Sequence, residues 1–154
     1  MKKKYFLVIL FLILAIFLNG CGMVPPGIPE WARAEQEVYS YWIAITNRQY
    51  ELAKWHCVYD GLWYNKTDEW EEYINTNSEG DASLVIYEPV FYKQTEVIGE
   101  DIYDPDVRDE AIAYVRIYTD ITSFPGSCLH EGDVFEYEIE LHKQNYPPGD
   151  WMLK

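Results

Sequence analysis

The chain has 154 residues, of which 12 are Lys or Arg and 26 are Asp or Glu, so its formal net charge is −14. This acidic balance disfavours nucleic acid as a partner, because nucleic-acid binding rests on clustered Lys and Arg that neutralise phosphates. The aromatic content of 17% predicts a globular domain despite the acidity, because these side chains can supply a core.

The first twenty residues have the pattern of a secretory signal peptide. Three lysines at positions 2–4 precede an apolar run over residues 5–18. At about fourteen residues, the run has signal-peptide length and falls short of the roughly 20 needed to span a membrane. It ends in Leu18-Asn19-Gly20-Cys21, which resembles the lipobox of bacterial lipoproteins. That resemblance implies cleavage before Cys21 and a lipid on its thiol. The alternative is an uncleaved N-terminal anchor.

These features predict an exported protein, lipid-anchored to the outer face of a bacterial cell membrane or to the outer membrane. Without residues 1–20 and their three lysines, 9 basic residues remain against 26 acidic ones, a net charge of −17. An anionic lipid surface would repel such a domain, so we expect membrane attachment through the lipid on Cys21. Residues 21–29 are the lipidated Cys and a Pro/Gly tether, whose proline-rich part extends at most about 25 Å. Residues 30–154 suffice for one domain.

Helices are predicted in the first half of this domain. Pro29 suits a helix start, and apolar residues at steps of three and four predict a helix through Ile45. Its expected buried side chains are Trp31, Ala34, Val38, Tyr41, Trp42 and Ile45. A second helix is predicted from an Asn47 cap through Cys57, ending by Gly61. The third is predicted to begin at Thr67 as N-cap and to bury Trp70, Tyr73 and Ile74.

Strands are predicted after Gly80. Residues 84–98 are rich in Val, Ile, Tyr and Phe, and Pro89 indicates an edge position or a bulge within them. Residues 111–122 and 134–141 alternate between apolar and polar positions, which predicts two strands with one buried face each. Residues 150–154 are predicted to close the sheet as a short strand. Helices followed by strands predict an α+β fold.

The pattern Val38-x-x-Tyr41-Trp42-x-Ala44, then Gln49-Tyr50-x-x-Ala53 and a terminal Gly149-Asp150-Trp151-x-Leu153, resembles the nuclear-transport-factor-2-like superfamily. The resemblance implies a cone-shaped, cystatin-like roll in which N-terminal helices pack in a curved antiparallel sheet. The superfamily includes ketosteroid isomerase and SnoaL-like enzymes and many lipoproteins of unknown role. The fold therefore implies a scaffold, and function must come from a site.

Enzymes of that superfamily place an Asp or His base inside the cone, with a Tyr or acid that polarises a carbonyl. The inward positions predicted for the second and third long strands hold no carboxylate or imidazole, which argues against an enzyme. The remaining catalytic candidates are His56, Asp60 and Tyr64, with Tyr59 beside them, near the end of the second helix. They define the alternative function, an isomerase or dehydratase-like enzyme with His56 or Asp60 as base.

No cofactor is expected, and His56, His130 and His142 lack the spacing of metal ligands. The acidic residues 100–110 are interpreted as a solvated hairpin connection; calcium binding is the alternative, but the segment lacks the pattern of a calcium loop. Cys57 and Cys128 form an even pair in an exported chain, which predicts a disulfide; two buried free thiols are the alternative.

The outward face of the second long strand carries Tyr114, Arg116 and Tyr118, residue types enriched at interfaces. We therefore expect a binding or interaction module. Its partner would be a second copy of the chain, another envelope protein, or a small apolar ligand held in the cone.

Overall fold

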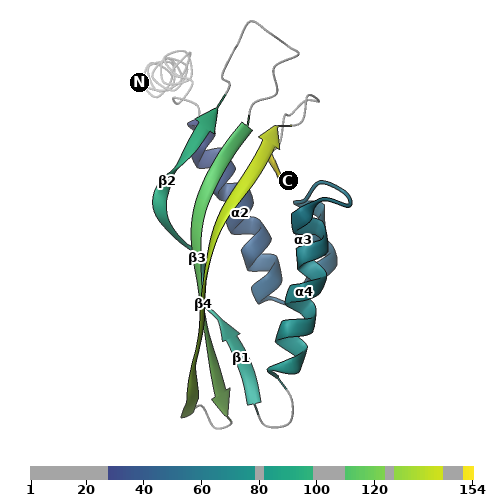
Figure 1. Ribbon diagram of the computed structural model, residues 1–154, viewed down its shortest axis with the longest axis vertical. Coiled ribbons are helices and arrows are strands. Elements are labelled where there is room, and N and C mark those ends of the chain that lie inside the picture. The colour runs from purple at the N-terminus through teal and green to yellow at the C-terminus, as the bar shows by residue number, and fades with distance from the viewer. Residues whose placement is uncertain (1–27, 79–81, 99–109, 124–126, 144–150) are drawn as a thin grey trace, which may run out of the picture.

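The computed structural model describes residues 28–78, 82–98, 110–123, 127–143 and 151–154, with backbone alone for residues 123 and 127–131. The helices of these described segments are α2 (Glu30–Thr46), α3 (Tyr50–Trp55) and α4 (Leu62–Thr76). The strands are β1 (Ala82–Ile86), β2 (Val90–Ile98), β3 (Glu110–Ser123), β4 (Ser127–Lys143) and β5 (Trp151–Leu153). The predicted α+β class is confirmed: the helices pack against a strongly curled antiparallel half-barrel sheet (Figure 1).

Helix α2 confirms the first predicted helix. It follows Pro29, whose fixed φ suits a helix start. Five of the six side chains expected on its apolar face are fully buried: Ala34, Val38, Tyr41, Trp42 and Ile45. Trp31 is 37% exposed, so the prediction of its burial was wrong. It lies in the first turn, near the end of the sheet.

The second helix is shorter than predicted and starts later. Asn47 is the C-cap of α2, and Arg48 takes a left-handed φ of 58° in the turn before α3. The helix stops at Trp55 because the following backbone pairs with the last strand. Leu153 N–H donates to His56 O, and Val58 N–H donates to Leu153 O. These two bonds to Leu153 thus replace helical hydrogen bonds at His56 and Val58.

The third helix begins five residues before the predicted N-cap. Its N-cap is Gly61, and Thr67 lies inside the helix, fully buried. The Thr67 hydroxyl donates to Trp63 O at 2.9 Å and lies 3.2 Å from the Tyr41 hydroxyl. A Thr that satisfies its hydroxyl on the preceding turn can occupy a helix interior, which explains the error.

Among the described residues, the strands form one five-stranded sheet in the order β1-β3-β4-β5, with β2 also paired to β3. β1 and β2 share one edge of β3: Ile86 is opposite Thr119, and Val90 is opposite Arg116. Pro89 lies between these strands and is buried, so it ends one strand and precedes the next, where an edge position or a bulge was predicted within a single stretch. β4 begins at Ser127, earlier than predicted, and β5 pairs with its far end.

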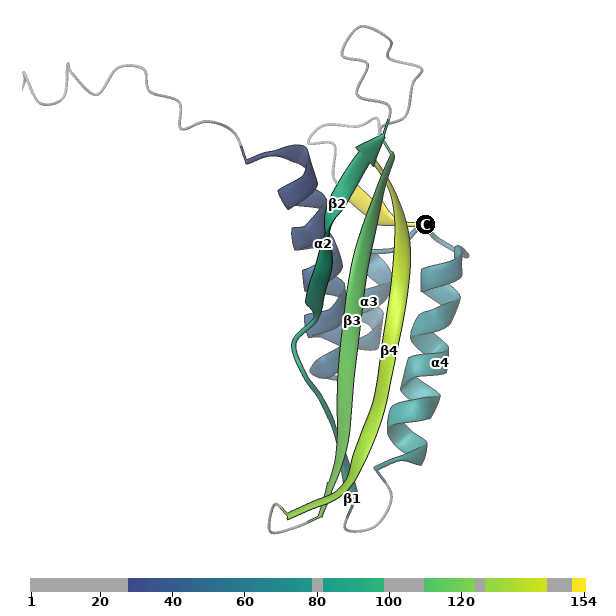
Figure 2. The same cartoon turned by 60° about the vertical axis from the view of Figure 1, so that its left-hand side comes forward.

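The sheet curls around the helices (Figure 2). The inward residues of β3 and β4 alternate as predicted, and Ala113, Val115, Ile117, Ile139 and Leu141 are fully buried. The long hairpin of β3 and β4 has register shifts near Thr119, where Gly132 approaches the neighbouring backbone closely. Such bulges bend a strand and increase its twist.

Candidate functional site

Aromatic side chains fill the described space between the helices and the sheet. Trp42 is fully buried at its centre. Its ring meets Tyr41, Trp63 and Trp70 edge to face, with centroids 5.1–6.0 Å apart. It also stacks on Tyr137 at 5.7 Å. These are the geometries that aromatic pairs prefer, so the chain's own rings pack against one another between the helices and the sheet.

The tyrosines in this cluster are suited to packing rather than to proton transfer. Burial raises the pKa of Tyr137 to about 12, and it also raises the pKa of Tyr41 well above its ordinary value. Both therefore remain neutral phenols near neutral pH. Tyr41 has a hydrogen-bond partner in Thr67, as buried tyrosines usually do.

His56, the first catalytic candidate, pairs with a carboxylate of α2. Its Nδ1 lies 2.6 Å from Glu37 Oε1, and the two side chains are 21% and 24% exposed. Cys57, the next residue, is buried, and desolvation together with the nearby Glu37 raises the pKa of its thiol to about 12. A thiol in this state is a poor nucleophile.

The other candidates do not join His56. Asp60 is exposed in the turn before α4, with a left-handed φ of 58°. Tyr64 is half-buried and lines a pocket to which neither His56 nor Asp60 contributes. The structure therefore does not assemble the three residues predicted as catalytic candidates around one point.

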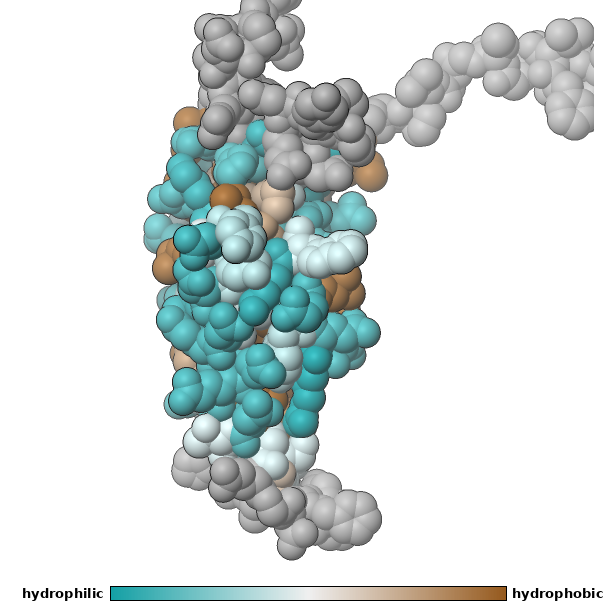
Figure 3. Space-filling model, turned by 90° about the vertical axis from the view of Figure 1, so that its right-hand side faces the viewer, coloured by the Kyte–Doolittle hydropathy of each residue, from teal (hydrophilic) through white to brown (hydrophobic). Residues whose placement is uncertain are grey.

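That pocket lies at the corner between α3, the start of α4 and the end of the sheet, and we call it the corner pocket. Its volume is about 430 Å³. Its lining residues are Glu51, Lys54, Trp55, Cys57, Val58, Tyr59, Tyr64, His142 and Met152. Trp55 is 78% exposed and Tyr59 82% exposed. Figure 3 views the α3–α4 side, which is mostly hydrophilic with some pale and brown side chains.

The corner pocket was not predicted, because the second helix was expected to continue through Cys57, whereas α3 ends at Trp55. The available signal was the density of aromatics in residues 55–64, which holds Trp55, Tyr59, Trp63 and Tyr64. Of these, Trp63 alone is counted in the core. A helix of six residues has too few turns for the spacing of its apolar residues to show which side is buried and which is exposed.

The outward face of β3 carries the predicted interface residues in a connected ladder. Tyr114 is 9% exposed, and the Lys93 ammonium lies 4.0 Å from its ring centroid. The Arg116 guanidinium lies 4.9 Å from the Tyr92 ring, and its Nε donates to Glu136 at 2.7 Å. Tyr118 is half-buried.

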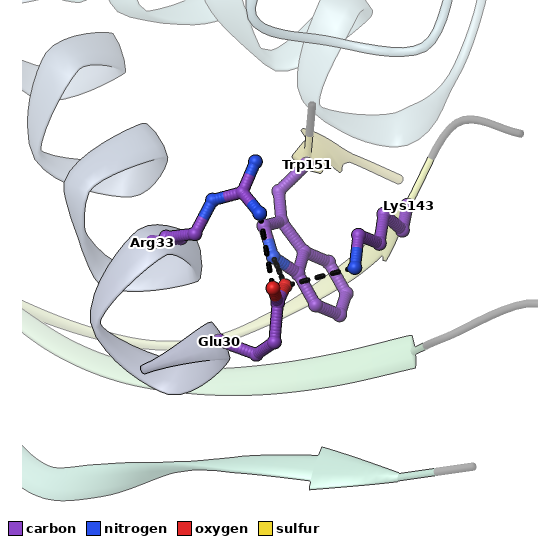
Figure 4. A network of polar contacts seen from close by, with 4 residues as sticks. All are labelled: Glu30, Arg33, Lys143 and Trp151. Atoms are coloured by element: carbon purple, nitrogen blue, oxygen red, sulfur yellow. Dashed lines mark hydrogen bonds and ion pairs between the residues drawn. The ribbon is translucent and has the colours of Figure 1, made fainter. Parts of the chain in front are cut away.

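A second polar network fixes the N-terminal end of the domain (Figure 4). The Glu30 carboxylate accepts from Trp151 Nε1 at 3.1 Å and contacts Lys143 at 3.0 Å and Arg33 at 2.9 Å. Partial burial acts to raise the pKa of Glu30, but Lys143 and Arg33 outweigh it and hold this pKa below its ordinary value. The network joins the start of α2 to β4 and β5.

The predicted disulfide does not form in this structure. Cys57 has a free thiol, and its backbone pairs with Leu153, which pairs in turn with Leu141. The Cys128 backbone pairs with Thr122 near the other end of β4. Thirteen residues of strand between 128 and 141 extend roughly 40 Å, whereas a disulfide needs Cα atoms within about 7 Å.

The remaining predicted features lie largely outside the described residues. Cys21 and residues 100–109 belong to this group, so their predicted roles stay predictions. Within the described segments, no cluster of His, Cys, Asp or Glu could hold a metal ion. In those same segments, no helix combines the length and hydropathy needed to cross a membrane.

Neither the sequence models of known protein families nor the curated protein sequences match this chain. The fold therefore defines its class: an α+β domain of N-terminal helices on a curled antiparallel half-barrel sheet.

Proposed function

We propose that this chain is a membrane-anchored, extracytoplasmic lipoprotein whose folded domain is a binding or interaction module with a nuclear-transport-factor-2-like architecture. The observation that carries the proposal is the aromatic cluster around Trp42, which fills the described interior with the chain's own side chains. A filled interior leaves the surface as the place of action.

The dispersal of the catalytic candidates supports a binding role over turnover. General acid–base catalysis needs its groups within hydrogen-bond reach of one substrate. His56 faces Glu37, Asp60 is on the surface, and Tyr64 lines the corner pocket. The enzyme alternative retains one favourable observation, the His56–Glu37 pair, which resembles a base held by a carboxylate.

The anchor part of the proposal rests on residues 1–29. The lipobox at Cys21 and the short apolar run support export and lipidation. Replacing Cys21 by Ser should release the protein from the membrane fraction and abolish incorporation of labelled palmitate. Cys57→Ser is the matched control and should retain both. Palmitate labelling of Cys21→Ser at the level of the wild type would remove this part of the proposal.

The interaction part includes a homodimer through the outward face of β3, at Tyr114, Arg116 and Tyr118. Light scattering on the full chain in detergent should show a dimer that Arg116→Glu dissociates, because two copies of this face would then meet with like negative charges. Arg48→Glu, on the turn after α2, is the control. A monomer at all concentrations would exclude this interface and leave an envelope protein as partner.

Native mass spectrometry of the full chain, extracted from its own envelope, tests the proposal as a whole. We expect a dimer or a complex with a second protein, without a small molecule retained in the interior. A stoichiometric bound metabolite, held by the monomer and lost when His56 is replaced, would favour the enzyme instead.

A further inference from the structure

The corner pocket combines exposed aromatic rings with one carboxylate, that of Glu51. Trp55 and Tyr59 are more exposed than any other large apolar or aromatic side chain in the described residues. Glu51 lies one turn before Trp55 on α3, and both line the pocket. Exposing two large rings forgoes the stabilisation of burial, and Tyr59 meets Tyr64 edge to face at 5.3 Å. The large exposed areas of Trp55 and Tyr59 therefore indicate a contact that the isolated chain does not make.

The domain repeatedly pairs cations with aromatic rings. Lys54 lies over Tyr64 at 5.0 Å, Lys93 over Tyr114 at 4.0 Å and Arg116 over Tyr92 at 4.9 Å. Two further pairs of this kind are Lys66 with Tyr137 and Lys143 with Trp151. Within the described residues, no Lys or Arg lies over Trp55 or Tyr59. Tyr59 packs edge to face on Tyr64, but it and Trp55 both keep exposed surface that can receive a cation from outside.

The charges around the corner pocket favour a cation over an anion. Lys54 is already engaged by Asp68 at 2.7 Å and by Glu51 at 3.8 Å. Glu51 is 87% exposed, and Asp60 is an exposed carboxylate next to Tyr59. The chain from residue 21 onward carries a net charge of −17, and a field of this sign raises the local concentration of cations.

We infer that the corner pocket binds a Lys or Arg side chain from a basic segment of a partner polypeptide. The Trp55 and Tyr59 rings form the platform, and Glu51 supplies the counter-charge. A volume of about 430 Å³ is at the lower end of ligand pockets, which suits an inserted side chain. The inference rests on the proposed interaction role and names the chemistry of the partner.

Fluorescence anisotropy with the full chain in neutral detergent provides the test. The probes are a short labelled peptide of Lys, Gly and Ser, its Arg counterpart, and a version with Gln in place of each cation. We expect both cationic peptides to bind and the Gln peptide to bind at least about ten-fold more weakly. The affinity should fall as NaCl rises from about 50 to 500 mM.

Variants locate the binding. The pair Trp55→Ala/Tyr59→Ala should weaken the cationic peptides about ten-fold, whereas Leu62→Ala, which also removes an exposed side chain at this corner, should change affinity less than two-fold. Glu51→Gln should weaken binding a few-fold and flatten the salt dependence. All of these positions are exposed, so circular dichroism should show an unchanged fold.

Three results would overturn the inference: equal binding of the Gln peptide, unchanged binding by the aromatic double variant, or binding of a neutral oligosaccharide in place of the cationic peptides. The last would identify the rings as a sugar-stacking platform. If the double variant still forms its dimer or envelope complex, the proposed interaction role stands although the inference fails.

Discussion

At the scale of single residues, a hydrogen bond in the core has a definite direction. Thr67 has one hydroxyl proton and gives it to Trp63 O, so Tyr41 must be the donor to Thr67 Oγ1. Both side chains are fully buried, and an unpaired buried hydroxyl is costly.

Thr67→Val should therefore lower the free energy of unfolding by about 1–3 kcal/mol, because Tyr41 loses its acceptor while the side-chain shape is kept. Urea denaturation measures the loss. Adding Tyr41→Phe removes the stranded donor, so the double variant should be more stable than Thr67→Val alone. A double variant that loses the sum of both single losses would contradict this assignment.

Glu30 gives a residue-scale prediction for pH. The pKa of Glu30 is lower in the folded than in the unfolded protein. The ionised carboxylate therefore stabilises the fold fully above the ordinary pKa of 4.5, and this stabilisation is lost as pH falls through the lowered pKa. Glu30→Gln should cost about 1 kcal/mol at pH 7. The cost should shrink below pH 4.5, as unfolding curves at both pH values would show. The control Glu72→Gln, at an exposed position of α4, should change the free energy of unfolding little at either pH. If Glu30→Gln costs the same at both pH values, the ionised form of Glu30 is not what stabilises the fold.

At the scale of elements, the features that could be predicted from the sequence are those that depend on the periodic spacing of apolar residues. Apolar spacing located α2, and alternation located the buried faces of β3 and β4. The ends of α3 and the start of α4 were not predictable in this way. They depend on pairing of residues 56–58 with Leu153 and on the contact of Thr67 with Tyr41, partners distant in sequence.

The bulge in the long hairpin was likewise invisible to periodicity, and it depends on Gly132. A Cβ at this position would lie 2.2 Å from Thr119 O. Gly132→Ala should therefore destabilise the protein by about 2 kcal/mol or more, because backbone must move to admit the methyl group. Gly61→Ala is the matched control: its nearest contact, Val58 O, is at 3.0 Å, so its thermal shift should be smaller. Equal shifts would show that the bulge relaxes freely.

At the scale of the whole molecule, the candidate site was only partly predictable. His56, Asp60 and Tyr64 lie within nine residues, but the strand-like pairing after Trp55 and the turn at Asp60 separate their side chains. Trp55 is exposed at the corner pocket, and α3 ends at this residue. The aromatic content of the sequence indicated that rings would supply much of the core. It could not indicate which rings would contact one another, because those contacts join residues far apart in the sequence.

The net charge makes a prediction for the whole molecule. In the described residues, seven basic side chains form ion pairs: Arg33, Lys54, Lys66, Lys93, Arg116, Lys143 and Lys154. Most of these pairs have at least one exposed partner, and such pairs contribute little each. The excess of 17 negative charges from residue 21 onward destabilises the compact state by repulsion.

Salt weakens both the attraction within the ion pairs and the repulsion among the excess negative charges, and we expect the repulsion to be the larger of the two. Raising NaCl from about 20 to 500 mM should therefore stabilise the protein by about 1 kcal/mol, or about 4 °C in melting temperature. Differential scanning calorimetry at pH 7 measures the shift. The same scan near pH 4, where carboxylates begin to be protonated, should show a smaller one. A melting temperature that falls with salt at pH 7 would mean that the ion pairs outweigh the repulsion.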